Sequence, residues 1–97
     1  MKKDSVIRRL KSLKNLLRTV GVCQLGLFGS TVRSENTAKS DIDILLDFDL
    51  GQETYGNFLM ACQILENNFK RYKLDVVTRK GLSPYIGPTI LKEVEYV

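Results

Sequence analysis

Residues 41–48 form the segment Asp-Ile-Asp-Ile-Leu-Leu-Asp-Phe, which limits the chain to a fold containing a half-exposed β-strand. Neighbouring side chains of an extended strand point to opposite faces of a sheet. One face of this strand is therefore apolar, and the other carries acids. The predicted core face holds Ile42, Ile44, Leu46 and Phe48, and the opposite face holds Asp41, Asp43, Leu45 and Asp47.

The rest of the chain alternates between helical and extended patterns. Apolar residues recur at steps of three and four in two long segments, which predicts two amphipathic helices. This order predicts an α+β (or α/β) layer structure, with helices covering one face of a small sheet. We expect a helix from Asp4 or Ser5 to Val20, strands at 22–28, 41–48 and 73–78, a helix at 55–72, and a short helix at 89–94.

The length of 97 residues predicts a single domain, residues 1–97, with no room for a second, acceptor-binding domain. No apolar run approaches the roughly 20 residues of a membrane helix, and the start does not resemble a signal peptide, so we expect a cytoplasmic protein away from membranes. Cys23 and Cys62 lack metal-ligand spacing and are expected to be reduced core residues. The absence of histidine excludes Ser-His and Cys-His relays and His-ligated zinc.

The net charge of +4 comes largely from lysines and arginines near the N-terminus. Such a run is usually the solvated face of a helix, although it also leaves an RNA-binding face open. The chain lacks the interleaved exposed aromatic residues of a base-stacking platform, so direct nucleic-acid binding is disfavoured. Association of several copies of the chain stays open.

Three aspartates lie in predicted strands, where aspartate is usually disfavoured: Asp41, Asp43 and Asp75. Taken singly, each has an ordinary explanation as a turn acid or a solvent-facing residue. Taken together on neighbouring strands, they would concentrate negative charge unless a cation neutralised it. Mg²⁺ prefers such oxygen ligands, and two ions can stabilise the attacking and leaving oxygens of a displacement at phosphorus.

The pair Gly29-Ser30 follows the predicted strand 22–28 and precedes Asp41 by a gap of ten residues. On its own it is typical of a plain turn, and the segment lacks the Gly-Lys-Ser/Thr of a Walker-type ATPase. Beside a metal-holding strand, however, its N–H groups and hydroxyl could hold phosphate oxygens. Metal and phosphate together indicate nucleotide chemistry.

Gly29-Ser30, the ten-residue gap, Asp41-x-Asp43 and the later Asp75 resemble the minimal nucleotidyltransferases of the polymerase-beta-like superfamily. The resemblance covers roughly residues 5 to 95. It implies a small mixed sheet with flanking helices, Mg²⁺ held by Asp41, Asp43 and Asp75, and a triphosphate held by Gly29 and Ser30. Arg33 matches an arginine common in the family, whereas its neighbour Ser34 stands where glycine is common.

Single-domain members of this family are typically antitoxins encoded beside a HEPN-domain RNase toxin, and some transfer AMP from ATP to a tyrosine of that toxin. The resemblance therefore implies a Mg²⁺-dependent, ATP-binding protein adenylyltransferase with two metal ions. Two alternatives stay open: a nucleotidyltransferase-fold binding module that neutralises a toxin by occlusion alone, and transfer to RNA or a small molecule. The missing second domain counts against the last of these.

Overall fold

The computed structural model describes residues 1–37 and 39–97, so Ala38 of the predicted loop lies outside the described residues. These described residues form three α-helices, one short 3-10 helix and four strands. They are α1 (Lys3–Arg18), β1 (Val22–Phe28), η1 (Gly29–Thr31), β2 (Ile42–Phe48), α2 (Tyr55–Asn68), β3 (Leu74–Thr78), α3 (Gly87–Glu93) and β4 (Glu95–Tyr96).

The strands form one mixed sheet in the order β3-β2-β1-β4. Strand β1 is antiparallel to both β2 and β4, whereas β2 and β3 run parallel. In this register Asp43 of β2 lies beside Asp75 of β3 on one side and Phe28 of β1 on the other. The small mixed sheet of the predicted α+β fold is confirmed.

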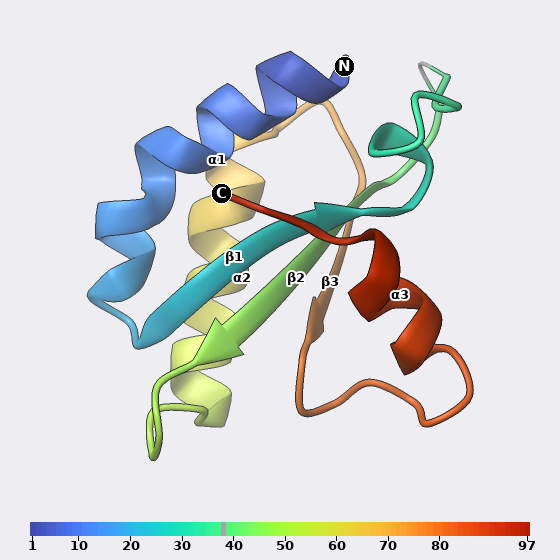
Figure 1. Cartoon of the computed structure of the whole chain (residues 1–97). Coiled ribbons are helices and arrows are strands. Elements are labelled where there is room, and N and C mark those ends of the chain that lie inside the picture. The colour runs from blue at the N-terminus through green and yellow to red at the C-terminus, as the bar shows by residue number, and fades with distance from the viewer. Residues whose placement is uncertain (38) are drawn as a thin grey trace.

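Helices α1 and α2 lie together on one face of the sheet (Figure 1). The largest core cluster lies between them and the strands, and it is lined from the sheet by the predicted apolar face of β2. Ile44 and Leu46 of that face are completely buried. The alternation of β2 therefore places its acids on the opposite face, as predicted. The helical side of the cluster consists of Val6, Leu10, Leu13, Leu17, Ala61 and Leu65.

Both long helices are confirmed, with corrections at their ends and on one face. Helix α1 begins at Lys3, ahead of the predicted caps Asp4 and Ser5. Helix α2 ends at Asn68, short of residue 72, and its buried stripe passes through Ala61 and Leu65. Tyr55 and Leu59, expected on that stripe, are exposed because they lie on the side of α2 away from the sheet. In the part of the chain that the structure describes, no helix is long and apolar enough to span a membrane.

The short helix α3 packs over the opposite face of the sheet. Helices therefore cover both faces, whereas the sequence predicted them on one face only. Its Ile90 forms a second cluster with Phe28 and Leu45, and Val94 packs against that cluster. Leu45, which lies on the acidic face of β2, is thereby only 1% exposed. Helix α3 thus covers the middle of this face and lies next to the end that carries Asp43 and Asp75 (Figure 1).

The two cysteines are free, as predicted, but the expectation that both lie in the core is wrong for Cys23, which is exposed. The register between β1 and β2 shifts between Val22 and Gln24. Such a bulge interrupts the alternation of side chains between the two faces of a sheet. Cys23 lies within this bulge, so its side chain does not follow the alternation of the strand. Cys62 is half-buried on α2.

Replacing Thr54 by alanine is expected to destabilise the fold by about 1 kcal/mol. Thr54 is the N-cap of α2, and its side chain accepts the Asn57 N–H at 3.1 Å. Alanine leaves this N–H without its partner. Urea unfolding followed by circular dichroism measures the loss, with Glu53→Ala at the neighbouring exposed position as the control. Equal stability of the two variants would show that the cap contributes nothing.

Candidate active site

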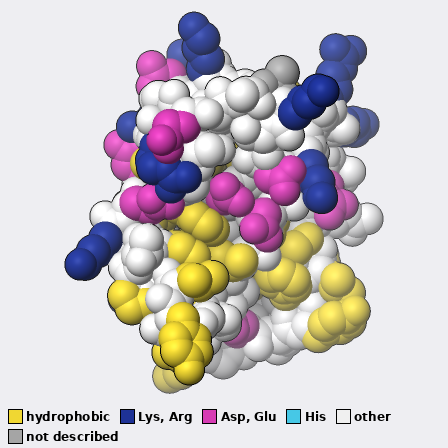
Figure 2. Space-filling view, turned by 90° about the vertical axis from the view of Figure 1, so that its right-hand side faces the viewer, with side chains coloured by type: hydrophobic (Ala, Val, Ile, Leu, Met, Phe, Trp, Pro, Cys, Tyr) yellow, Lys and Arg dark blue, Asp and Glu magenta, His cyan; other side chains and the backbone are white. Residues whose placement is uncertain are grey.

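Acidic side chains gather at the end of the sheet where β2 and β3 begin. Asp43 and Asp75 are register partners in these parallel strands, and Asp41 immediately precedes β2. Asp41 and Asp43 are half-buried, whereas Asp75 is exposed. Figure 2 shows Asp and Glu side chains across the middle of this side of the molecule, with Lys and Arg among them and apolar side chains below. The fold therefore brings the three predicted acids to one place.

Asp43 is the acid whose protonation the site perturbs most clearly. Burial, and after it the negative charges of Asp75 and Asp41, raise the pKa of Asp43 from 3.8 to about 6. A hydrogen bond with Asp75 and the charge of Glu93 act in the same direction. The ionised carboxylate is thus held where its neighbours disfavour it, and a bound cation would relieve this repulsion.

The backbone of Gly29 lies directly against this carboxylate. Gly29 has a φ of +77°, in the left-handed region that glycine tolerates. A Cβ atom at this position would lie 2.0 Å from Oδ2 of Asp43, far inside van der Waals contact. Glycine is required here for two reasons, the backbone conformation and the close approach to the acid.

The residues after Gly29 form a tight turn that points Arg33 back toward Gly29. The Arg33 N–H donates to the Gly29 carbonyl at 3.2 Å, and the Glu35 N–H donates to the Ser30 carbonyl at 2.9 Å. Ser34 has a φ of +59°, which explains why a glycine is favoured there. Ser34 therefore adopts the left-handed backbone conformation that a glycine would adopt at this position of the turn. Ser30 is half-buried beside Gly29.

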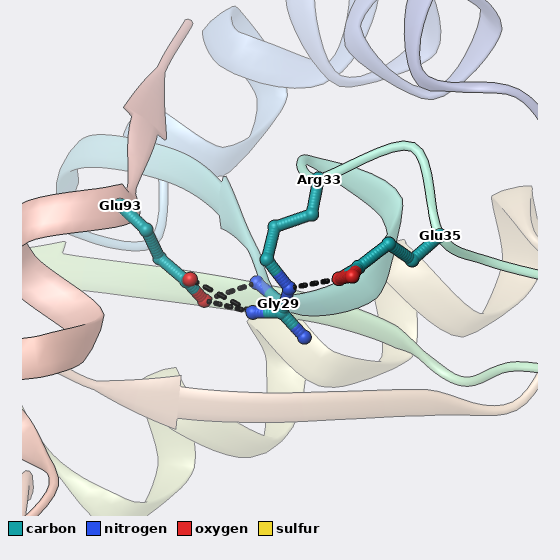
Figure 3. Close-up of polar contacts among 4 residues, drawn as sticks. All are labelled: Gly29, Arg33, Glu35 and Glu93. Carbon is teal, nitrogen blue, oxygen red and sulfur yellow. Dashed lines mark hydrogen bonds and ion pairs between the residues drawn. The ribbon is translucent and has the colours of Figure 1, made fainter.

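Glu93, at the end of α3, joins the site although the sequence did not single it out. Its Oε1 accepts the Gly29 N–H at 2.8 Å, and Nη1 of Arg33 donates to Oε1 at 3.1 Å and to Oε2 at 2.8 Å (Figure 3). Nε of Arg33 donates to Glu35. These hydrogen bonds to Glu35 and Glu93 raise the pKa of Arg33 above its ordinary value. Glu93 lies 64 residues beyond Gly29, and no local pattern connects the two.

The acids supply a donor set that suits a hard divalent cation. Within residues 1–37 and 39–97, no three His, Cys, Asp or Glu side chains are already arranged as a metal site. The mutual repulsion of Asp41, Asp43 and Asp75 nevertheless makes their carboxylates fit a cation such as Mg²⁺, which binds one or two carboxylates together with substrate phosphates. These three residues are the ones that could hold it.

The raised pKa of Asp43 predicts a pH dependence of stability in metal-free buffer. Between pH 4 and 6 the folded protein binds this proton more tightly than the unfolded chain does, so the contribution of Asp43 to stability falls as the pH rises. Solvent screening limits the change to roughly 1 kcal/mol. Comparing urea unfolding of wild type and Asp43→Asn at pH 4 and 7, with EDTA, isolates this contribution. A difference between the proteins that stays constant with pH would contradict the assignment.

Known proteins share this chain's sequence pattern. The family model of the nucleotidyltransferase domain matches residues 6–97. The protein adenylyltransferase MntA of Thermococcus cleftensis is 36% identical over 87% of this chain and 83% of its own length. A candidate protein adenylyltransferase of Methanocaldococcus jannaschii, MJ1379, is 33% identical over 98% of this chain and 93% of its own length.

Solved structures share the fold. A candidate minimal nucleotidyltransferase superposes with a TM-score of 0.82 at 26% identity, covering 98% of this chain and 95% of its own. A toxin–antitoxin structure with AMP-PNP superposes with a TM-score of 0.68, covering 99% of this chain and 72% of its own, and its 17% identity shows the fold alone. The family model, the sequence relatives and the fold agree: the chain belongs to the nucleotidyltransferase domain family.

Proposed function

We propose that this protein is a Mg²⁺-dependent adenylyltransferase that transfers AMP from ATP to a hydroxyl group of a partner protein. The observation that carries the proposal is the contact between Gly29 and the Asp43 carboxylate, beside Asp75 and Asp41. A backbone N–H for phosphate and a set of carboxylates for metal then lie within one small site. Such a site suits displacement at the α-phosphorus of a nucleoside triphosphate.

Two metal ions would be held by Asp41, Asp43 and Asp75. Bound there, Mg²⁺ would lower the pKa of the acceptor hydroxyl and neutralise charge on the triphosphate and on the departing pyrophosphate. The raised pKa of Asp43 supports this assignment, because burial and then the negative charges of Asp75 and Asp41 disfavour the ionised carboxylate, which a bound cation would stabilise.

The chain's own groups would position the reactants. The Gly29 N–H, the Ser30 hydroxyl and the Arg33 guanidinium would hold the phosphate oxygens of ATP. Asp75, the most exposed of the three acids, would orient the acceptor hydroxyl and take its proton. The acceptor oxygen then bonds to the α-phosphorus, the bond to the β-phosphate oxygen breaks, and pyrophosphate leaves.

The acceptor is proposed to be a HEPN-type RNase toxin, so that the protein acts as a cytoplasmic antitoxin. One sequence relative is a protein adenylyltransferase named MntA. A structure of a mutant MntA–HpeT toxin–antitoxin shares the fold, with a TM-score of 0.65 at 15% identity. The exposed position of Asp75 supports an acceptor that arrives on a separate macromolecule.

A binding module without turnover is the second candidate function. One observation favours it: Glu93 accepts hydrogen bonds from both Gly29 and Arg33, the groups assigned to phosphate. In that case the protein would neutralise its partner by covering it. The retained acids Asp41, Asp43 and Asp75 favour the enzyme.

One experiment separates the two candidates. The protein is incubated with α-labelled ATP, Mg²⁺ and the product of the adjacent gene, and growth rescue of toxin-expressing cells is measured in parallel. An adenylyltransferase labels the partner, and Asp41→Asn and Asp43→Asn lose both labelling and rescue. Rescue by both variants, with no label transferred by wild type, would establish the binding module instead. Label on RNA would overturn the protein acceptor.

A further inference from the structure

The carboxylate of Glu93 binds two of the three groups that the proposed function assigns to the triphosphate. It accepts the Gly29 N–H at 2.8 Å, and both of its oxygens accept from Nη1 of Arg33, at 3.1 and 2.8 Å (Figure 3). A carboxylate and a phosphate offer the same kind of acceptor, an anionic oxygen pair that a guanidinium and a backbone N–H bind well. The site therefore already binds an anion, and that anion belongs to the protein.

One N–H and one guanidinium nitrogen cannot serve two anions in the same place. A triphosphate bound to Gly29 and Arg33 would bring its negative charge against Glu93, with Asp43 adjacent. The two occupants therefore exclude each other. The Arg33 guanidinium donates to Glu35 as well as to Glu93, whereas the Gly29 N–H donates to Glu93.

The backbone of Glu93 is fixed by packing, but its side chain can leave the contact locally. Ile90, one helical turn earlier on the same side of α3, is buried against Phe28 and Leu45, and Val94 contacts the same cluster. Strand β4 pairs with β1 immediately after. The Glu93 side chain is 22% exposed and Arg33 is 48% exposed, so the carboxylate has a route to solvent. Rotation of the Glu93 side chain would therefore clear the site without any movement of α3.

We propose, building on the proposed function, that Glu93 is an internal competitor for the triphosphate chain and that a nucleoside triphosphate binds by displacing its carboxylate from Gly29 and Arg33. Glu93 thus sets the affinity for the donor nucleotide. It also keeps Arg33 aimed at Gly29 before the nucleotide arrives. Removing its charge makes binding of the phosphate chain tighter, whereas removing a phosphate ligand would make it weaker.

The test is calorimetric titration of two probes, AMP-PNP and inorganic tripolyphosphate, each with Mg²⁺. The proteins are wild type, Glu93→Gln and Glu93→Ala. The control is Glu95→Gln, because Glu95 lies two residues away and pairs with Lys3 at 2.8 Å, outside the Gly29 contact. We expect both Glu93 variants to bind each probe roughly tenfold more tightly, and the control to match wild type. Circular dichroism checks that each variant is folded.

A second readout follows the Gly29 amide proton by NMR. In Glu93→Ala without ligand its resonance should move toward that of an amide without an anionic acceptor, and tripolyphosphate should restore it. Unchanged or weaker binding by both Glu93 variants would overturn the inference while leaving the proposed function in place. Tightening for AMP-PNP but not for tripolyphosphate would also overturn it, because the effect would lie away from the phosphates. If no protein, wild type included, bound either probe, the proposed function itself would fail.

Discussion

Replacing Asp43 by asparagine is expected to lower the rate of AMP transfer by at least about a thousandfold, because the loss of a metal-holding carboxylate removes stabilisation of the transition state. Asp43 lies between Gly29 and Asp75, so its carboxylate faces both the proposed phosphate site and the proposed metal site. The measurement is the initial rate of label transfer to the partner protein at saturating ATP and Mg²⁺.

The matched control for this variant is Asp47→Asn. Asp47 lies on the same strand, has the same half-buried status and is the register partner of Gln24, away from Asp75. We expect it to retain the wild-type rate. Asp43→Asn should be at least as stable as wild type at pH 7, because the ionised Asp43 carboxylate is disfavoured in the folded protein. Equal rates of AMP transfer by Asp43→Asn and Asp47→Asn would show that Asp43 has no specific role in the reaction.

Replacing Gly29 by alanine is expected to destabilise the fold by about 3 kcal/mol and to abolish transfer. The added Cβ would lie 2.0 Å from Oδ2 and 2.8 Å from Cγ of Asp43, so strand β2 or the turn has to move. The φ of +77° adds a further cost for any residue with a side chain. Urea unfolding measures the stability, and the labelling assay measures the transfer.

Gly51→Ala separates the cost of the steric contact with Asp43 from the cost of the left-handed backbone conformation. Gly51 has nearly the same backbone conformation, with a φ of +79°, but a Cβ there would have no neighbour within 4 Å. Its loss of stability should be only about 1 kcal/mol, the cost of a left-handed conformation. The difference between the two variants then measures the contact with Asp43. If both alanines had the same effect, the close approach of Gly29 to Asp43 would be contradicted.

The elements that the sequence predicted best are those with strong periodicity. The expected strand 22–28 matches β1, and the alternation at 41–48 places Ile44 and Leu46 in the core. The stripe of α2 was less accurate, because Tyr55 and Leu59 match the helical spacing yet face away from the sheet. Periodicity gives the face of a helix only approximately, and tertiary packing decides which residues at its border are buried.

The predicted site was local in sequence, and this is why it could be identified. Gly29, Ser30 and Arg33 lie within one short segment, and Asp41 immediately precedes β2, which contains Asp43, so sequence spacing places each group close together. Asp75 joins them through the parallel pairing of β2 and β3. Its position beside Asp43 depends on the sheet order, which single-sequence patterns do not determine.

Glu93 could not be found in this way. It lies in the segment Leu-Lys-Glu-Val-Glu, which holds three charged and two apolar residues, and no motif distinguishes Glu93 from Glu95. Its contact with Gly29 depends on how α3 packs across Phe28 and Leu45, and that packing joins distant parts of the chain. At Ser34 the structure instead gives the reason for a known pattern. Its positive φ accounts for the glycine that is common at this position in the family that the sequence resembles.

The most direct test of the adenylyltransferase assignment is the intact mass of the partner protein after incubation with this protein, ATP and Mg²⁺. The product of the adjacent gene should gain the mass of one or more AMP units with wild type and none with Asp43→Asn, and EDTA should prevent the gain. Peptide mapping should place the AMP on a hydroxyl side chain. A partner whose mass is unchanged by wild-type protein, although the two proteins bind each other, would contradict the account.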